Sequence, residues 1–320
     1  MATVEISSGL AQVDNEPRYH YDIYAILEAP QELYFGHETQ VNVNVVETVR
    51  VPTDDGTIEK CYMSPTKRRG VERRSLIWAP VQSDGVLLGD KLGCGIPHTC
   101  TQIECPICAV YGGLIPSATD VEVMGKKSKR QPATTIGRLV HGGGVAIQEL
   151  EPSEKQRAMH PSMLHKDPGA DPTPTPFKRE YNEPALLYPV YNHCMSITES
   201  EFQAVAYAYL DSHARLGAGN PKGVKIYEAE WQTALQPLLV VDRYLAPLGK
   251  RPVLSPQISK IQQAVDAFCS AATSVRNKPT TEAHTKIEED DTTVFERWIG
   301  DAALTELQNY SVNFALAYLK

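Results

Sequence analysis

Apolar and polar residues alternate along the first third of the chain in the manner of β-strands. In the segment VNVNVVETVRV (41–51), Val41, Val43 and Val45 alternate with Asn42 and Asn44, which is the period of a half-buried strand. The phase slips at Val45-Val46, which favours a β-bulge at that point. Residues 19–28 predict another strand, and the run TDDG that ends at Gly56 predicts a turn.

Beyond residue 184 the pattern changes between strand and helix. Residues 185–197 predict a strand in which Pro189 is tolerated at a sheet edge. Thr198 and Glu201 have the spacing of a capping box, which predicts that a helix follows at once. That helix ends near Gly217, where a glycine-rich loop begins.

Two more helices are predicted before the chain ends. Ser255-Pro256 favours the start of one, because apolar residues follow at spacings of three, four and three. Thr293 and Glu296 have the spacing of a second capping box, which predicts a final helix toward the C-terminus. Strands thus dominate the first half and helices are interspersed late in the second. This order is typical of an α+β fold.

Proline interrupts the pattern between residues 151 and 189, most densely in the run DPGADPTPTP. Such a segment lacks the backbone donors for a helix or a central strand. We therefore predict a long loop there, which is either functional or disordered.

The composition is that of an ordinary globular chain. Of the 320 residues, 42% are hydrophobic and 22% are charged, which excludes a largely disordered protein. No apolar run approaches the roughly 18 residues that span a bilayer. Because no basic residue precedes Arg18, we expect no signal peptide, and we expect a cytoplasmic protein without a membrane partner.

Charge is distributed unevenly along the chain. The formal net charge is −8, yet residues 60–140 hold 12 lysines and arginines against 6 acidic residues. A segment whose charge opposes that of its host indicates a basic surface on an acidic body, which suits nucleic acid. The cations form two groups, Lys67, Arg68, Arg69, Arg73 and Arg74, and Lys126, Lys127, Lys129 and Arg130. A solvated face without a partner is the alternative.

Four of the seven cysteines crowd into one stretch, at Cys94, Cys100, Cys105 and Cys108. In a cytoplasmic chain such a cluster indicates a metal site rather than disulfides. Zn²⁺ binds four thiolates tetrahedrally, so we predict one structural zinc ion on these cysteines. His98 lies inside the cluster and could replace Cys94 or Cys100. Reduced cysteines that only pack, and a catalytic zinc, are the alternatives.

Signatures of common enzyme classes are missing. A nucleobase deaminase needs H-x-E upstream of P-C-x-x-C, but Glu104 precedes Cys105 and no His is followed two residues later by Glu. The run GKKS (125–128) only partly matches a phosphate loop, because Asp120 stands at the first glycine position. Neither H-E-x-x-H nor G-x-S-x-G occurs. We therefore expect a non-catalytic protein.

The sequence RLGAGNPKG (215–223) is another candidate for binding phosphate. Glycines let a backbone approach a phosphate closely, and flanking cations add charge-assisted contacts. The residues concerned are Arg215, Gly217, Gly219, Lys222 and Gly223. The alternative is a helix C-cap with a tight turn, because Gly217 occupies a C′ position.

Taken together, these motifs resemble the RNA-binding backbone subunits of type I-D CRISPR Cascade complexes, which belong to the RAMP superfamily. The resemblance is carried by SPTKRRGVERR (64–74), GCGIPHTCTQIECPIC (93–108), the proline-rich loop and SHARLGAGNPKG (212–223). It implies a core similar to an RNA-recognition motif (RRM), with a ferredoxin-like sheet. The first part of this core is expected in residues 1–59, and the rest of it, with helical segments, in 185–320. Between them the resemblance implies a basic zinc-binding insertion in 60–140 and a proline-rich lid in 141–184.

Subunits of this family polymerise along the guide RNA (crRNA) with other Cascade subunits and present it for pairing with target DNA. The resemblance therefore implies that both cationic groups and the glycine-rich loop contact RNA, mainly through its backbone. The predicted strands carry no recognisable aromatic RNP motif. Sequence-specific recognition of the ordinary RNA-motif kind is therefore not expected.

Two rival functions remain open. Some RAMP relatives cut the paired strand with a single acidic residue, for which Asp22 and Asp84 are unranked candidates. The other rival is a zinc-containing interaction module that binds no RNA.

Overall fold

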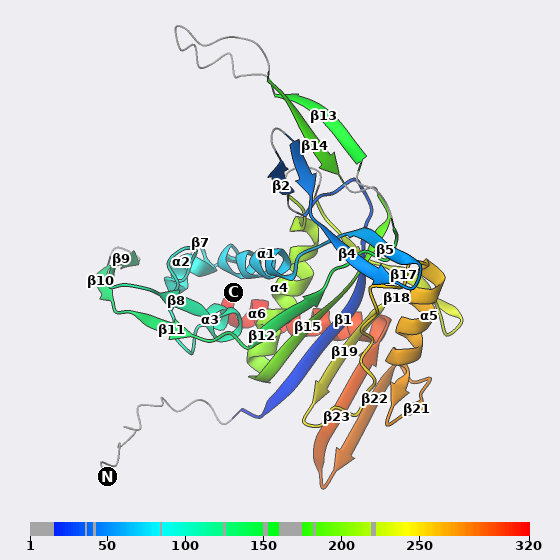
Figure 1. The fold of residues 1–320 in the computed structure, drawn as a ribbon. Coiled ribbons are helices and arrows are strands. Elements are labelled where there is room, and N and C mark those ends of the chain that lie inside the picture. Colours follow the sequence, from blue (N-terminus) through cyan, green and yellow to red (C-terminus); the bar gives the residue numbers. More distant parts are fainter. Residues whose placement is uncertain are drawn as a thin grey trace, which may run out of the picture.

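The computed structural model describes residues 16–35, 37–40, 43–83, 85–123, 126–149, 153–159, 175–181, 184–218 and 222–320. Its centre is an antiparallel sheet with the strand order β12-β15-β1-β19-β23-β22 (Figure 1). These strands are β12 (Leu139–Gly143), β15 (Leu186–Thr198), β1 (Arg18–Ala29), β19 (Leu239–Tyr244), β23 (Thr292–Ile299) and β22 (His284–Glu289). The short β16 (Lys225–Ile226) also pairs with β1.

Four of these strands and two helices form a βαββαβ unit. Along the chain the unit runs β1, α1 (Pro65–Ile77), β12, β15, α4 (Glu199–Ser212) and β19. In the sheet these strands lie in the order fourth, first, third, second, all antiparallel. This topology is the ferredoxin-like split βαβ arrangement, so the predicted α+β fold with an RRM-like core is confirmed.

The two faces of the sheet are covered differently. Tyr21, Ile23 and Leu27 of β1 belong to the main core with α1, α4 and α6 (Asp301–Tyr318), while Tyr24 and Ile26 belong to a second core on the other face. That second core includes α5 (Ile261–Ala272) and the hairpin of β17 (Glu228–Trp231) and β18 (Ala234–Pro237). Within the described residues, no helix has both the length and the apolar character needed to cross a bilayer.

Several local predictions are confirmed. β1 covers the strand expected at 19–28, and the TDDG turn joins β4 (Thr48–Thr53) to β5 (Gly56–Cys61). The capping box is present in full, because Thr198 accepts a hydrogen bond from the Glu201 amide and Glu201 accepts one from the Thr198 amide.

Other local predictions are wrong. The final helix expected from Thr293 begins only at Asp301, as α6, because residues 292–299 form strand β23, in which Phe295, Arg297 and Ile299 alternate onto one face. The helix expected from Ser255 begins only at Ile261, as α5. β15 is an internal strand, so Pro189 does not lie at a sheet edge. It is accommodated because β12 ends opposite Val190, one residue away.

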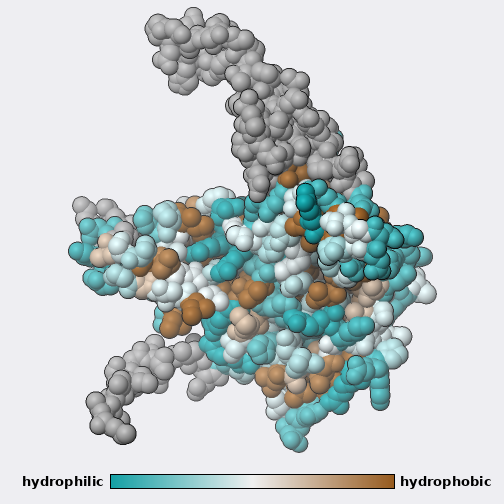
Figure 2. All heavy atoms as spheres, viewed as in Figure 1, coloured by the Kyte–Doolittle hydropathy of each residue, from teal (hydrophilic) through white to brown (hydrophobic). Residues whose placement is uncertain are grey.

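A module that contains the cysteines projects from the core between α1 and β12 (Figure 1). It consists of β6 (Pro80–Val81), β7 (Val86–Leu87), α2 (Leu88–Leu92), α3 (Pro106–Tyr111), β8 (Gly113–Ile115), β9 (Thr119–Val123), β10 (Lys126–Arg130) and β11 (Ala133–Thr135). The predicted insertion, 60–140, is therefore longer than this module, because α1 belongs to the core. Apolar side chains are exposed on the module (Figure 2), among them Ile96, Ile103, Leu114 and Ile136.

A separate four-stranded sheet has the order β13-β14-β3-β2. It consists of β13 (Ser153–Met159), β14 (Thr175–Tyr181), β3 (Val43–Val46) and β2 (His37–Gln40), and β14 runs parallel to β3. The proline-rich segment was predicted as a loop, but two parts of it pair here as a hairpin. The run DPGADPTPTP lies mostly outside the described residues. Near α5, β20 (Ser274–Val275) pairs with β21 (Lys278–Pro279).

Candidate metal centre and nucleic-acid interface

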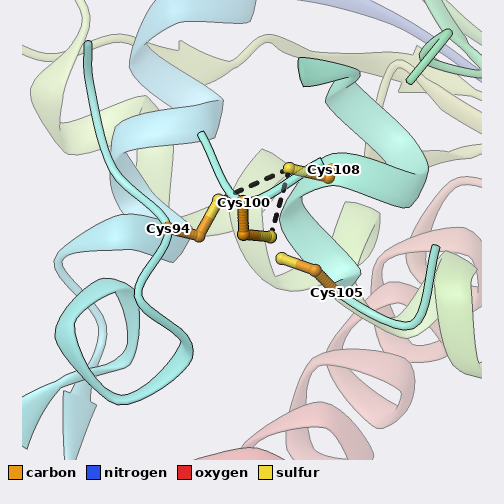
Figure 3. Close-up of side chains that lie close together, drawn as sticks. All are labelled: Cys94, Cys100, Cys105 and Cys108. Carbon is orange, nitrogen blue, oxygen red and sulfur yellow. Dashed lines mark hydrogen bonds between the residues drawn. The ribbon is translucent and has the colours of Figure 1, made fainter. Parts of the chain in front are cut away.

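The four clustered cysteines meet at one point of the projecting module. Cys94 follows α2, Cys100 lies in the next loop, Cys105 is the N-cap of α3 and Cys108 lies in its first turn (Figure 3). All four are buried, and their sulfur atoms lie within 4.8 Å of one another. Among the described residues this is the one group of cysteine, histidine and acidic side chains gathered closely enough to hold a metal ion.

The sulfur geometry fits a tetrahedral zinc ion. Zn–S bonds of about 2.3 Å imply S···S separations of about 3.8 Å. The Cys94 and Cys100 sulfurs lie 3.4 and 3.6 Å from the Cys108 sulfur. Hydrogen bonds among the four sulfurs lower the pKa of Cys100 and Cys108 and raise the pKa of Cys94 and Cys105. His98 is exposed and outside the group, so the geometry gives it no part in replacing a cysteine.

Backbone contacts hold the cysteine loops in place. Arg130 donates hydrogen bonds to the carbonyl oxygens of Thr99, at 2.9 Å, and Gly93, at 2.6 Å. Thr135 on β11 donates to the Thr101 carbonyl at 2.6 Å. Because both terminal nitrogens of Arg130, Nη1 and Nη2, donate inside the module, this predicted RNA-binding residue holds the cysteine loops together.

The cysteine module does not fold around a separate core. Its buried residues, including Ile107, Val110 and Tyr111, belong to the same apolar cluster as the helix face of the central sheet. Arg69 of α1 also donates a hydrogen bond to the Tyr111 carbonyl. A change at the four cysteines should therefore disturb the main core as well as the insertion.

The cations of α1 point in different directions. Arg68 is 1% exposed and donates to the Gly142 carbonyl at 2.7 Å and to Asn192 Oδ1 at 3.2 Å. The prediction that Arg68 contacts RNA is therefore wrong, because its guanidinium is enclosed between α1 and the sheet. Arg73 is half-buried, and its Nε and Nη2 atoms are shielded from solvent without a hydrogen-bond partner among the described residues.

Arg68 belongs to a buried polar network. Glu72, one turn further along α1, accepts hydrogen bonds from Asn192, Tyr111 and His141, the last at 2.6 Å. Burial raises the pKa of the Glu72 carboxyl, but the charges of His141 and Arg68 outweigh this and hold it below its usual value. The network thus stabilises a charged residue inside the core.

The glycine-rich loop and the remaining face of α1 meet in a cleft of about 540 Å³. Lys67, Gly70 and Arg74 line it from the helix, and Gly217 and Ala218 line it from the loop. Lys67 and Arg74 are seven residues apart, so they lie on one helical face about 10 Å apart along the axis. Two segments distant in the sequence, each predicted to bind RNA, therefore form one site.

The two cations in this cleft differ in whether a carboxylate already pairs with them. Lys67 forms an ion pair with Glu47, which offsets its charge. The Arg74 guanidinium lies 6.0 Å from the centre of the half-exposed Trp78 ring. Arg74 is therefore the cleft cation better placed to meet a phosphate.

The glycine-rich loop follows α4 and a short 3-10 helix (His213–Arg215), and a hydrogen bond brings its two described ends together. Gly217 and Gly223 have φ angles of 117° and 107°, and the Gly223 amide donates to the Leu216 carbonyl at 2.8 Å. Lys222 is exposed beside Gly223, whereas Gly219 lies outside the described residues. The start of the loop thus ends the helical segment and forms one wall of the cleft.

Other predicted cations lie elsewhere. Arg215 forms a two-point ion pair with Asp211, at 2.9 and 3.0 Å. Strand β10 carries Lys126, Lys127 and Lys129 at the tip of the cysteine module, away from α1 (Figure 1). Lys129 is exposed, and the side chains of the other two lie outside the described part of the chain. The structure does not bring this group to the cleft.

A run of three glycines beside the cleft was missed in the sequence. The Gly144 φ angle is 96°, and a Cβ there would lie 2.0 Å from the Met63 carbonyl oxygen. A Cβ on Gly142 would overlap the Tyr191 ring. The run HGGG (141–144) was a visible signal, because consecutive glycines at a strand end indicate close backbone approach.

The two acidic candidates for nuclease activity also have defined places. Asp22 is 2% exposed and accepts hydrogen bonds from Tyr24, Tyr244 and His193. Asp84 lies outside the described residues. Asp22 is thus the centre of a hydrogen-bonded group rather than a free carboxylate.

Comparison with known proteins gives similarity at the level of structure alone. No family model and no curated protein matches the chain. The crystal structure of Csc2 from Thermofilum pendens is 13% identical, with 95% of this chain and 89% of that chain covered and a TM-score of 0.39. A chain of a type IV-B CRISPR complex is 14% identical, with 77% and 98% covered and a TM-score of 0.34. The fold class rests on the strand order given above.

Proposed function

We propose that this chain is an RNA-binding backbone subunit of a CRISPR complex, of the RAMP type. The observation that carries the proposal is the convergence of α1 and the glycine-rich loop on one cleft. These two segments also carry the sequence resemblance to RAMP subunits. The βαββαβ core agrees with what that resemblance implies.

The cleft has the chemistry of a phosphate site. Arg74 supplies a cation, and exposed Lys222 precedes Gly223, whose amide donates to the carbonyl of the cleft residue Leu216. The first turn of α1, at Thr66 and Lys67, lines the same cleft and contains no acidic residue, so the positive end of the helix dipole is not neutralised there. Contacts of this kind bind the backbone of RNA without reading its bases.

In finer detail, we propose that the chain acts in a type I-D Cascade complex. Copies polymerise along the crRNA and, with other Cascade subunits, present it for pairing with target DNA. The exposed apolar residues of the cysteine module are suited to contacts between subunits. The four cysteines hold Zn²⁺ in a structural role, because four thiolate ligands leave no open coordination position.

We also propose that the subunit is not catalytic. The burial of Asp22 and its three hydrogen bonds argue against its use as a metal-dependent nuclease residue. Incubation of the assembled complex with target strand and Mg²⁺ should leave the strand intact. Periodic cuts would support the nuclease alternative instead.

Equilibrium binding of the full chain to a fluorescently labelled single-stranded RNA tests the main proposal. Arg74→Ala and Lys222→Ala should each weaken binding equally for unrelated RNA sequences. Each should also reduce the slope of log K against log salt by about 0.7, the value for one lost phosphate contact on a single strand.

Lys278→Ala is the matched control, because Lys278 is exposed on β21, away from α1 (Figure 1). It should leave both affinity and salt slope unchanged. Equal effects of all three substitutions would indicate diffuse attraction rather than a site. Failure of the unchanged chain to bind RNA would favour an interaction module that binds no RNA.

A further inference from the structure

A second hollow, of about 310 Å³, lies near the face of the sheet opposite α1 and α4. Tyr62, Tyr191 and Pro189 line it together with Ile147, Val253 and Ile258, and none of its described lining residues is charged. Tyr62 and Tyr191 are only partly buried. The hollow therefore offers aromatic rings inside an otherwise apolar pocket.

The backbone fixes the position of the Tyr191 ring. Gly142 pairs with Tyr191 across β12 and β15, and the ring occupies the space that a Cβ on Gly142 would take. The ring is thus held over the strand while it also lines the pocket. A ring held in place in this way loses little conformational freedom when a flat group stacks on it.

A cation lies beside the pocket. The ring centres of Tyr191 and His193 are 4.8 Å apart. His193 Nδ1 donates to buried Asp22 at 2.8 Å, and exposed Arg251 donates to His193 Nε2 at 2.5 Å and to the Tyr24 hydroxyl at 3.0 Å. Arg251 forms no ion pair with a carboxylate among the described residues, so its charge is available to an anion.

From this arrangement we propose that the pocket binds one unstacked nucleobase of a single-stranded RNA, with Arg251 near an adjoining phosphate. Tyr62 and Tyr191 supply the stacking surface, and the exposed lining residue Ser255 supplies a hydroxyl for the edge of the base. Every base has an aromatic face, so this site favours the presence of a base over any particular sequence.

The position of the pocket relative to the cleft supports an RNA ligand. Tyr62 lines the pocket and the next residue, Met63, lines the cleft. The segment that carries both pairs with the chain around Val145, through the bridge between Tyr62 and Val145. The two hollows thus lie on either side of one short stretch of backbone. The inference rests on the proposed function, because it uses the same RNA.

Two RNA probes of equal length distinguish this pocket from the phosphate cleft. One is an oligouridine, and the other has abasic residues throughout. The full chain should bind the oligouridine about 10-fold more tightly, in the range measured for one base stacked on an aromatic side chain. Tyr191→Leu should bring this ratio close to one and leave the affinity for the abasic RNA unchanged. Tyr191→Phe should retain the ratio.

Tyr207→Leu is the matched control, because Tyr207 is a partly buried tyrosine on α4, on the other side of the sheet. It should change neither affinity. As a measurement without substitution, photocrosslinking of 4-thiouridine RNA should label Tyr62 or Tyr191.

Equal binding of both RNAs by the unchanged chain would overturn the base pocket and leave the proposed function intact. Absence of any RNA binding would overturn both. If Tyr191→Leu instead abolished self-association and left RNA binding unchanged, the pocket would bind a side chain of a second copy, and the proposal would be wrong.

Discussion

Substitution of Arg68 by methionine should unfold the protein more easily without weakening RNA binding. Methionine has nearly the same helix propensity and a similar length, so α1 itself should be unaffected. What is lost is the guanidinium, which is 1% exposed and donates to Gly142 and Asn192. Glu72 then remains in the core without one of the two cations that offset its charge, His141 being the other.

The size of the effect follows from these contacts. Hydrogen bonds to charged groups contribute roughly 1.5–3 kcal/mol each, and removal of one partner from a buried charged group costs about 3–5 kcal/mol. The free energy of unfolding should therefore fall by about 4 kcal/mol. With an unfolding entropy of roughly 2.1 cal/mol/K per residue, this corresponds to a Tm about 6 °C lower for 320 residues.

Arg74→Met is the matched comparison, because it makes the same substitution six residues further along the same helix. Arg74 lines the cleft and has no carboxylate partner among the described contacts, so its Tm should change little while RNA affinity falls. Urea unfolding, thermal melting and RNA binding would be measured on both variants. If Arg68→Met melted like Arg74→Met and bound RNA as weakly, the inward position of Arg68 would be refuted.

Two further predictions concern the metal and the pH dependence. Metal analysis of the purified chain should find one zinc ion. The Cys105→Ser variant should lose this ion, and the whole chain should melt at a lower temperature because the cysteines belong to the main core. The control variant Cys269→Ser should keep the ion. Burial lowers the pKa of His213 from 6.5 to about 4, so the unfolded chain takes up this proton first. Stability should then fall by about 3 kcal/mol between pH 6.5 and 4. His213→Phe should lack that part of the fall in urea unfolding, and an identical pH profile would contradict the assignment.

The parts of the fold that the sequence predicted are those specified by neighbouring residues. The capping box at Thr198 consists of two hydrogen bonds within four residues, so the spacing of Thr198 and Glu201 was sufficient to predict the start of α4. The same spacing at Thr293 was misleading, because alternation through Phe295, Arg297 and Ile299 places these residues in a strand. Arg297 is buried there by a two-point ion pair with Asp242, a partner that no local pattern indicates.

In the candidate site, too, the parts built from neighbouring residues were predictable and the parts built from distant segments were not. The four cysteines lie within fifteen residues, so their meeting followed from their spacing. The run of cations on α1 does not by itself show which of these side chains face solvent and which face the core. Its helical period was a usable signal, because Arg68 shares a face with Val71, Glu72 and Ser75, all buried. The cleft depends on the approach of α1 to a loop distant in sequence, which a single sequence does not specify.

The three glycines after His141 explain how the segment Tyr62–Met63 can line both the cleft and the pocket. Adjacent side chains of an extended segment point to opposite sides, so Tyr62 and Met63 enter different hollows. That arrangement requires the segment to lie close to the end of β12, and a Cβ on Gly144 would lie 2.0 Å from the Met63 carbonyl. Gly142 in turn leaves room for the Tyr191 ring. The glycines therefore set the separation between the cleft beside α1 and the proposed base pocket, and a side chain at Gly144 should alter both hollows together.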